Sequence, residues 1–143
     1  MKKMDRKGFT LIELLAVIVI LAIIMVIAVP QILNVIDSSR ESAWKSNVKL
    51  IAEGIELGKT LTDTNMTTST FDINTVCAGT EAKDVTSDLQ TVADISSDDT
   101  TVTCSATQKG VITVTGKGQF KSQKTATVNC STGSCSISYP TGE

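Results

Sequence analysis

The residue with the most demanding chemistry in this 143-residue chain is Glu13, the only charged residue in the apolar run of residues 9–29. A carboxylate in such a segment costs about 2.5 to 3.5 kcal/mol at the centre of a bilayer and less near its surface. A cut between Gly8 and Phe9 would create an ammonium group at Phe9. We interpret Glu13 as the partner of that amine, in its own chain or in a neighbouring copy. The alternative is a carboxyl group that is protonated or reaches the membrane surface.

The second chemically distinctive group is the four cysteines, Cys77, Cys104, Cys130 and Cys135. A hairpin that turns at residues 131–134 would place Cys130 opposite Cys135. We therefore expect the disulfides Cys77–Cys104 and Cys130–Cys135, although four cysteines allow three pairings. Zinc is the rival interpretation. It is disfavoured because close Cys-x-x-Cys pairs and histidines are absent, so we expect neither a metal nor another cofactor.

The residue types needed for most catalytic sites are missing. Without histidine, the chain cannot build Ser-His-Asp or Cys-His nucleophiles or a histidine-based zinc hydrolase motif. The adjacent Asp98 and Asp99 are typical of solvated loop charges, and the glycines of residues 116–118 indicate a turn, not a phosphate-binding loop. We expect that the protein is not an enzyme.

The element that carries Glu13 is long enough to cross a membrane. As a helix, residues 9–29 would span about 31 Å, close to the thickness of the hydrocarbon layer. A secretory signal would have a shorter apolar region and a small-residue cleavage site. Four basic residues and one acidic residue precede the run, which predicts that the leader stays in the cytoplasm and that the rest faces outward, where disulfides persist. The chain is thus expected to pass once through the plasma membrane.

Residues 31–61 are expected to continue the helix as an amphipathic segment. Pro30 removes one hydrogen bond and predicts a kink at the end of the apolar residues 9–30. Beyond it, apolar residues recur at spacings of three and four. These are Ile32, Leu33, Ile36, Ala43, Trp44, Val48, Ile51 and Ile55.

The remainder predicts a small domain. Residues 62–99 are rich in Thr, Ser and Asp and indicate a connecting region over the domain surface, with one short helix near residues 84–93. Residues 100–143 alternate β-branched and polar side chains, which predicts an antiparallel sheet and a tail. The expected strands are residues 100–106, 111–115, 125–130 and 135–139. The fold class is α+β, with a long N-terminal helix, transmembrane and then amphipathic, packed against a disulfide-stapled sheet.

The string Lys7-Gly8-Phe9-Thr10-Leu11-Ile12-Glu13, followed by the apolar run, resembles the signature of type IV prepilins and pseudopilins. The resemblance covers roughly residues 1–50. It implies that prepilin peptidase removes residues 1–8 by cleavage between Gly8 and Phe9. It also implies N-methylation of Phe9, pairing of Glu13 with the Phe9 amine of a neighbour, and polymerisation through residues 9–30. Family members often have a mid-span glycine; Ala22 stands there in this chain, so any melted stretch depends on Pro30.

The resemblance implies a subunit of a bacterial type IV pilus, a helical homopolymer used for adhesion, aggregation or twitching motility. Its implied partners are itself, prepilin peptidase, the pilus assembly platform and motor, the membrane before assembly, and a host or other cell surface. The alternative is a pseudopilin of a type II secretion or competence (DNA-uptake) system.

DNA is not an expected partner of the filament surface. The chain has 13 basic and 15 acidic residues, and the leader takes four basic and one acidic, which leaves a net charge of −5 after Gly8. The cluster of Lys109, Lys117, Lys121 and Lys124 around Phe120 is more typical of lysines that protect a sheet edge from unwanted pairing.

Overall fold

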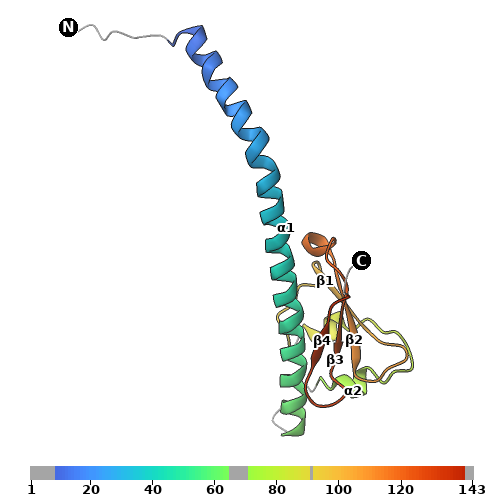
Figure 1. Ribbon diagram of the computed structural model, residues 1–143. Helices are drawn as coiled ribbons and strands as arrows, with labels where there is room; N and C mark the ends of the chain where they lie inside the picture. The colour runs from blue at the N-terminus through green and yellow to red at the C-terminus, as the bar shows by residue number, and fades with distance from the viewer. Residues whose placement is uncertain (1–8, 65–70, 91, 141–143) are drawn as a thin grey trace, which may run out of the picture. The chain divides into compact units, whose positions relative to one another are not determined.

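The computed structural model describes residues 9–64, 71–90 and 92–140 (Figure 1). The chain divides into two units, Met1–Ser38 and Ser39–Glu143. The expected leader, residues 1–8, lies outside the described residues. The elements in chain order are the helices α1 (Leu11–Asp63), α2 (Ile73–Val76) and α3 (Thr86–Leu89), the strands β1 (Thr100–Cys104) and β2 (Val111–Gly116), the 3-10 helix η1 (Gly118–Phe120), and the strands β3 (Ala126–Asn129) and β4 (Ser136–Ser138).

The first unit contains the beginning of α1, an apolar helix whose large side chains are exposed among the described residues. Its large hydrophobic side chains, from Leu11 to Ile36, are 40 to 82% exposed. By length and composition, α1 contains a segment apolar enough to cross a membrane. The helix is assigned without interruption through Pro30, so the kink expected there stays a prediction.

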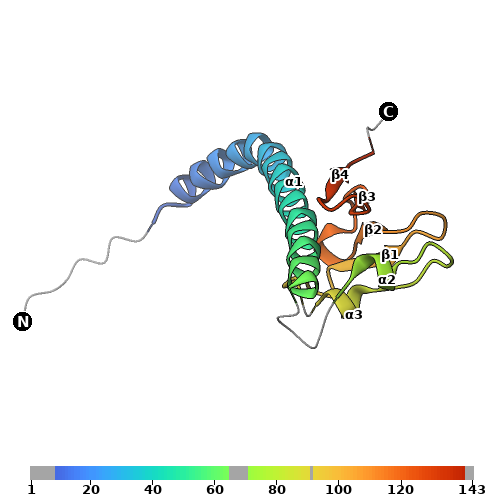
Figure 2. The same ribbon diagram turned by 90° about the horizontal axis from the view of Figure 1, so that it is seen from below.

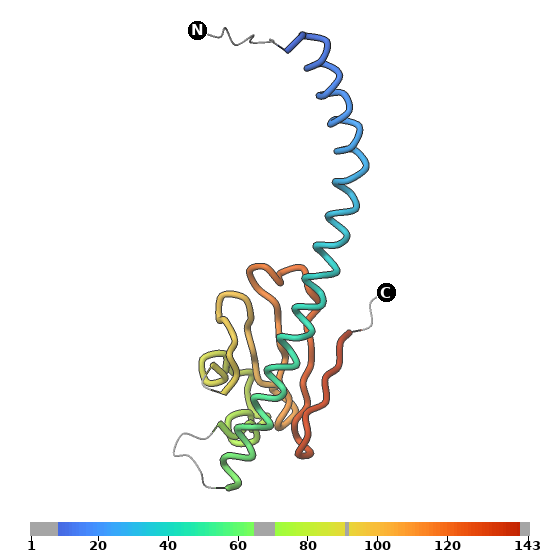
Figure 3. The backbone as a smooth tube through the Cα atoms, turned by 90° about the vertical axis from the view of Figure 1, so that its left-hand side faces the viewer, coloured from blue at the N-terminus to red at the C-terminus, as the bar shows by residue number. Residues whose placement is uncertain are grey.

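In the second unit, residues 39–63 of α1 cross one face of a four-stranded antiparallel sheet (Figures 1 and 3). The strand order is β1-β2-β3-β4. The α+β fold class expected from the sequence is therefore confirmed. The register pairs Val102 with Val114 in the first hairpin and Val128 with Ile137 in the last, so these side chains share the predicted face.

The core of this unit lies between the helix and the sheet. Trp44, Val48, Ile51 and Ile55 are buried and supply the helical side, as the sequence predicts. The Trp44 indole Nε1 donates a hydrogen bond to the Lys124 carbonyl at 3.0 Å, which satisfies the one polar atom of the largest core side chain.

The apolar stripe expected along residues 31–61 is buried only from Trp44 onward. Ile32, Leu33, Ile36 and Ala43 are exposed. Periodicity predicts which side of a helix is apolar, but it does not predict how far along the helix a cover extends.

The connecting region, expected to lie over the domain surface, also contributes buried side chains to the core. It contains the two short helices α2 and α3, which lie near β1 (Figure 2). Only the second was expected, and it covers less than residues 84–93. Helices of four residues are too short to show a helical period. The buried apolar residues of the region are Phe71, Ile73, Val85, Leu89, Ala93 and Ile95.

A close approach fixes this region against α1. Gly54 of the helix is buried, and a Cβ atom built on it would lie 2.7 Å from the Ala93 Cβ and 2.8 Å from the Val92 carbonyl oxygen. Only glycine allows the backbones to approach this closely.

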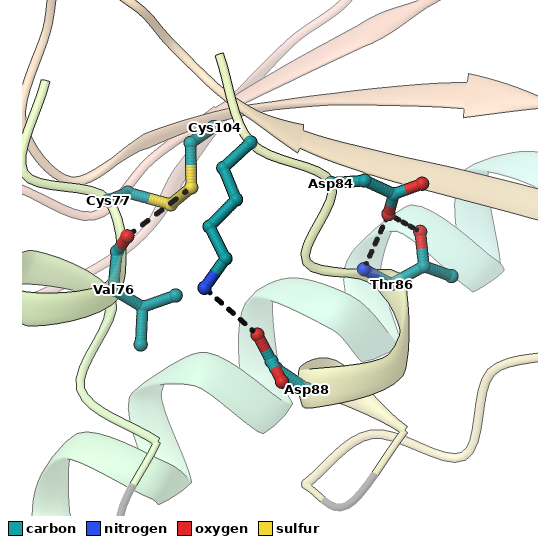
Figure 4. A network of polar contacts seen from close by, with 7 residues as sticks. Val76, Cys77, Asp84, Thr86, Asp88 and Cys104 are labelled. Carbon is teal, nitrogen blue, oxygen red and sulfur yellow. Dashed lines mark hydrogen bonds and ion pairs between the residues drawn. A yellow bond between two sulfur atoms is a disulfide. The ribbon is translucent and has the colours of Figure 1, made fainter. Parts of the chain in front are cut away.

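The structure contains the disulfides Cys77–Cys104 and Cys130–Cys135, the connectivity favoured from the sequence. The first ties the end of α2 to the end of β1 (Figure 4). Near it, Asp84 accepts hydrogen bonds from the Thr86 hydroxyl at 2.6 Å and from the Thr86 amide at 2.9 Å. The hydrogen bond from the Thr86 hydroxyl contributes most to holding the pKa of Asp84 below its usual value, and the bond from the Thr86 amide adds to this effect. The Thr86 hydroxyl in turn accepts the Val102 amide at 2.9 Å, which joins α3 to β1.

Removing the two disulfides separately should destabilise the sheet domain unequally. The bridge between Cys77 and Cys104 spans a sequence separation of 27, and the other spans 5. Chain entropy therefore predicts losses of about 3.5 and about 2 kcal/mol when each pair is replaced by alanine. Urea unfolding of the full-length protein in detergent, followed by Trp44 fluorescence, measures both losses. An equal effect, or a larger loss for the Cys130–Cys135 pair, would contradict the assignment of the first bridge as the main staple.

Candidate functional site

The candidate site is the start of α1, where Phe9, Thr10 and Glu13 lie together. Phe9 precedes the helix and is 87% exposed. Thr10 accepts the first helical hydrogen bonds, since its carbonyl receives the amides of Glu13 at 3.1 Å and Leu14 at 3.3 Å. Thr10 is therefore the N-cap residue of α1, and Glu13 lies in the first turn.

The Glu13 carboxylate folds back onto this cap. Its Oε2 accepts the Thr10 hydroxyl at 3.2 Å and lies 3.5 Å from the Thr10 amide nitrogen, which donates to it. Thr-x-x-Glu is the pattern of a capping box, in which the acidic side chain satisfies the free amide of the N-cap residue. A negative charge here is also favoured by the positive end of the helix dipole.

Sequence reasoning missed this role. We interpreted Glu13 as the partner of an amino group, whereas in the structure its carboxylate accepts hydrogen bonds from Thr10 of the same chain. The signal was present in the string Thr10-Leu11-Ile12-Glu13, directly before an apolar helix. The capping bonds place the carboxylate beside Thr10, the residue that follows Phe9, where cleavage would create an amino group.

The other residues singled out from the sequence fall in different places. Gly8 lies outside the described residues, so the geometry of the cleavage position is not described. All four cysteines are paired in disulfides. Among the residues that the structure describes, no group of three or more His, Cys, Asp and Glu side chains could hold a metal ion.

The four lysines do not form one surface patch around Phe120. Phe120 is buried against Trp44, with ring centroids 5.6 Å apart, so it is a core residue and does not form part of a surface patch. Lys109 belongs to the turn between β1 and β2. The remaining lysines, Lys117, Lys121 and Lys124, flank η1 between β2 and β3.

Comparison with known proteins identifies the N-terminal segment. Residues 3–29 match the model of the prokaryotic N-terminal methylation motif, which is characteristic of type IV pilins and pseudopilins. The chain is pilin-like at its N-terminus. No curated protein and no solved structure matches the chain.

The motif includes both Phe9 and Glu13 of the candidate site. It implies processing by prepilin peptidase and assembly into a filament, and it indicates a family of structural subunits. The capping box of Thr10 and Glu13 lies within this motif. The residues that follow the expected cleavage position are therefore also those that begin the helix.

Replacing Thr10 by valine should loosen the first turn of α1. The variant keeps the side-chain shape but loses the hydroxyl that donates to Glu13, and loss of such a hydrogen bond costs about 1 kcal/mol. Amide exchange at Glu13 and Leu14, measured by NMR in detergent micelles, should become about fivefold faster. Thr10→Ser keeps the hydroxyl and is the control. Equal exchange rates in the valine and serine variants would show that the hydroxyl does not stabilise the turn.

Proposed function

We propose that the protein is a structural subunit of a type IV pilus, polymerising through its N-terminal helix into an extracellular filament for adhesion, aggregation or twitching motility. The observation that carries this proposal is the uncovered apolar helix of the first unit, together with the methylation motif over residues 3–29. Water is a poor environment for such a surface. Lipid covers it before assembly, and the same helices of neighbouring subunits cover it in the filament.

Before assembly, the subunit is a single-pass protein of the plasma membrane. The basic leader holds the N-terminus on the cytoplasmic side, where prepilin peptidase cuts between Gly8 and Phe9 and Phe9 is methylated. The disulfide-bonded domain lies outside. The assembly platform and motor then transfer the helix from lipid to filament.

Glu13 sets the axial register of that transfer. An unpaired buried charge is strongly destabilising, so an incoming helix is favoured only where its carboxylate meets an amine. The Phe9 amine of a neighbouring subunit is such a partner. The capping bonds to Thr10 keep the Glu13 carboxylate at the helix start, ready for this contact.

The outer domain supports a pilus over a pseudopilin. Two disulfides staple a domain with a small core, and many exposed Thr and Ser side chains cover it. This composition suits long exposure outside the cell, and such a filament would contact a host or another cell surface. A pseudopilin of a secretion or competence system shares the N-terminal motif and is distinguished by experiment.

Replacing Glu13 by alanine should leave membrane insertion unchanged and reduce filament yield at least tenfold. Loss of about 1.4 kcal/mol per added subunit is enough for a tenfold change in the equilibrium of addition. Leu14→Ala, a truncation at the next position, is the matched control and should lower the yield far less. Membrane fractions and sheared filaments are quantified by immunoblot. Normal filament yield in the Glu13 variant would refute the register role.

Shearing of cells should release long fibres whose dominant band is this protein, beginning at a methylated Phe9. Electron microscopy gives the fibre length, and mass spectrometry gives the N-terminal residue. Short assemblies that stay in the envelope, with blocked secretion or transformation in a deletion strain, would indicate the pseudopilin. A mature protein that keeps residues 1–8, or stays a dispersed monomer, would contradict both.

A further inference from the structure

The outer domain keeps almost all its large apolar side chains inside, with two exceptions on α1. Among the described residues from Ser39 onward, Leu50 is 50% exposed and Leu57 is 55% exposed, and the other large hydrophobic side chains are buried or half-buried. They lie seven residues apart, and the exposed Ala43 lies seven residues before Leu50. We call Ala43, Leu50 and Leu57 the outer stripe.

The outer stripe is separate from the face of α1 that packs on the sheet. A spacing of seven residues is nearly two full turns, so the three side chains lie one above the other along the helix. The residues that pack on the sheet follow a different row, which includes Trp44, Val48 and Ile51. The domain's own core therefore does not account for the outer stripe.

The polar groups beside the outer stripe already have partners. The Glu53 carboxylate pairs with the Lys49 ammonium at 3.5 Å. The Thr60 hydroxyl donates to the Glu56 carbonyl at 2.9 Å. A surface that covers the outer stripe would thus leave neither group without its partner, which lowers the cost of burying these polar side chains, since only their water is lost.

We propose that the outer stripe packs against α1 of a second copy of this chain and extends the subunit contact from the apolar N-terminal helix into the outer domain. The inference rests on the proposed function, which brings identical helices together. Side chains spaced seven residues apart form one row along a helix, and such a row can pack against a second helix. The same seven-residue spacing reaches back from Ala43 to Ile36 in the apolar part of the helix, across the polar residues 37–42.

Charge favours a second copy meeting this surface. After Gly8 the chain carries a net charge of −5, so neighbouring copies repel each other except where the apposed surfaces are neutral. The outer stripe is apolar, and the nearby Lys49 and Glu53 cancel each other. Three side chains bury far less than the roughly 1,200 Å² that a stable interface needs, so the stripe acts only together with the helix of residues 9–38.

A photo-cross-linking amino acid at position 57 of the full-length protein tests the contact in assembled filaments. Irradiation should give a covalent dimer of this chain at least fivefold more abundant than with the same amino acid at Thr107, an exposed residue between β1 and β2. Peptide mapping should place the other end of the cross-link on α1 of the second copy. A cross-link to a different protein, or a dimer no more abundant than at position 107, would overturn the proposal.

A substitution pair separates packing from folding. The double variant Leu50→Ser and Leu57→Ser should leave the unfolding midpoint of the outer domain unchanged and reduce shear-resistant filaments at least threefold. Leu50→Met with Leu57→Met keeps the apolar surface and should restore them. Unchanged filaments in the serine variant would overturn the role of the stripe alone. Failure of the wild-type protein to form any filament would overturn the proposed function and this inference together.

Discussion

Residues 11–36 form an apolar helix that the described parts of the chain leave exposed. The need to remove this surface from water is the constraint on which the rest of the structure depends. Burial of such a surface is the largest favourable term in protein association. A helix of this kind is stable only in lipid or among other apolar helices. The same segment carries the methylation motif of residues 3–29, which is characteristic of type IV pilins and pseudopilins and implies assembly into a filament. In the proposed function, membrane insertion and filament assembly both remove the same apolar surface from water.

In the proposed filament, the polar residues at the start of α1 make that exchange specific. Dispersion and hydrophobic contacts between apolar helices hardly depend on axial position, since a shifted helix buries nearly the same area. A charge pair does depend on it. The capping box gives Glu13 a partner in the separate subunit, so the carboxylate has a hydrogen-bond donor before the proposed contact with a neighbour's amine. The capping bonds reduce the cost of carrying a charge into an apolar environment.

In the outer domain, the end of the same helix packs on a sheet and forms a small core. Its sheet is small, and one Trp and few other aromatic residues fill the core. The Cys77–Cys104 disulfide ties the connecting region to β1, and the close approach at Gly54 fixes it against α1. The Cys130–Cys135 disulfide closes the turn between β3 and β4. The bonds among Asp84, Thr86 and Val102 add a polar tie in the same region. Rigidity thus comes from local links where a large apolar core is missing.

The sequence alone determined the apolar helix, the α+β class, the strand pairing and the Cys130–Cys135 bridge, because each follows from a short-range pattern. Cys77–Cys104 was favoured only as the pair that this bridge leaves over. Hydrophobic length, alternation and the spacing of Cys130 and Cys135 around a turn are all readable along the chain. Only the tertiary structure decided where the sheet begins to cover α1, that residues 71–95 help to fill the core, and that Leu50 and Leu57 stay outside it. These features depend on contacts between distant segments, and a periodic pattern shows that a face is apolar without showing what covers it.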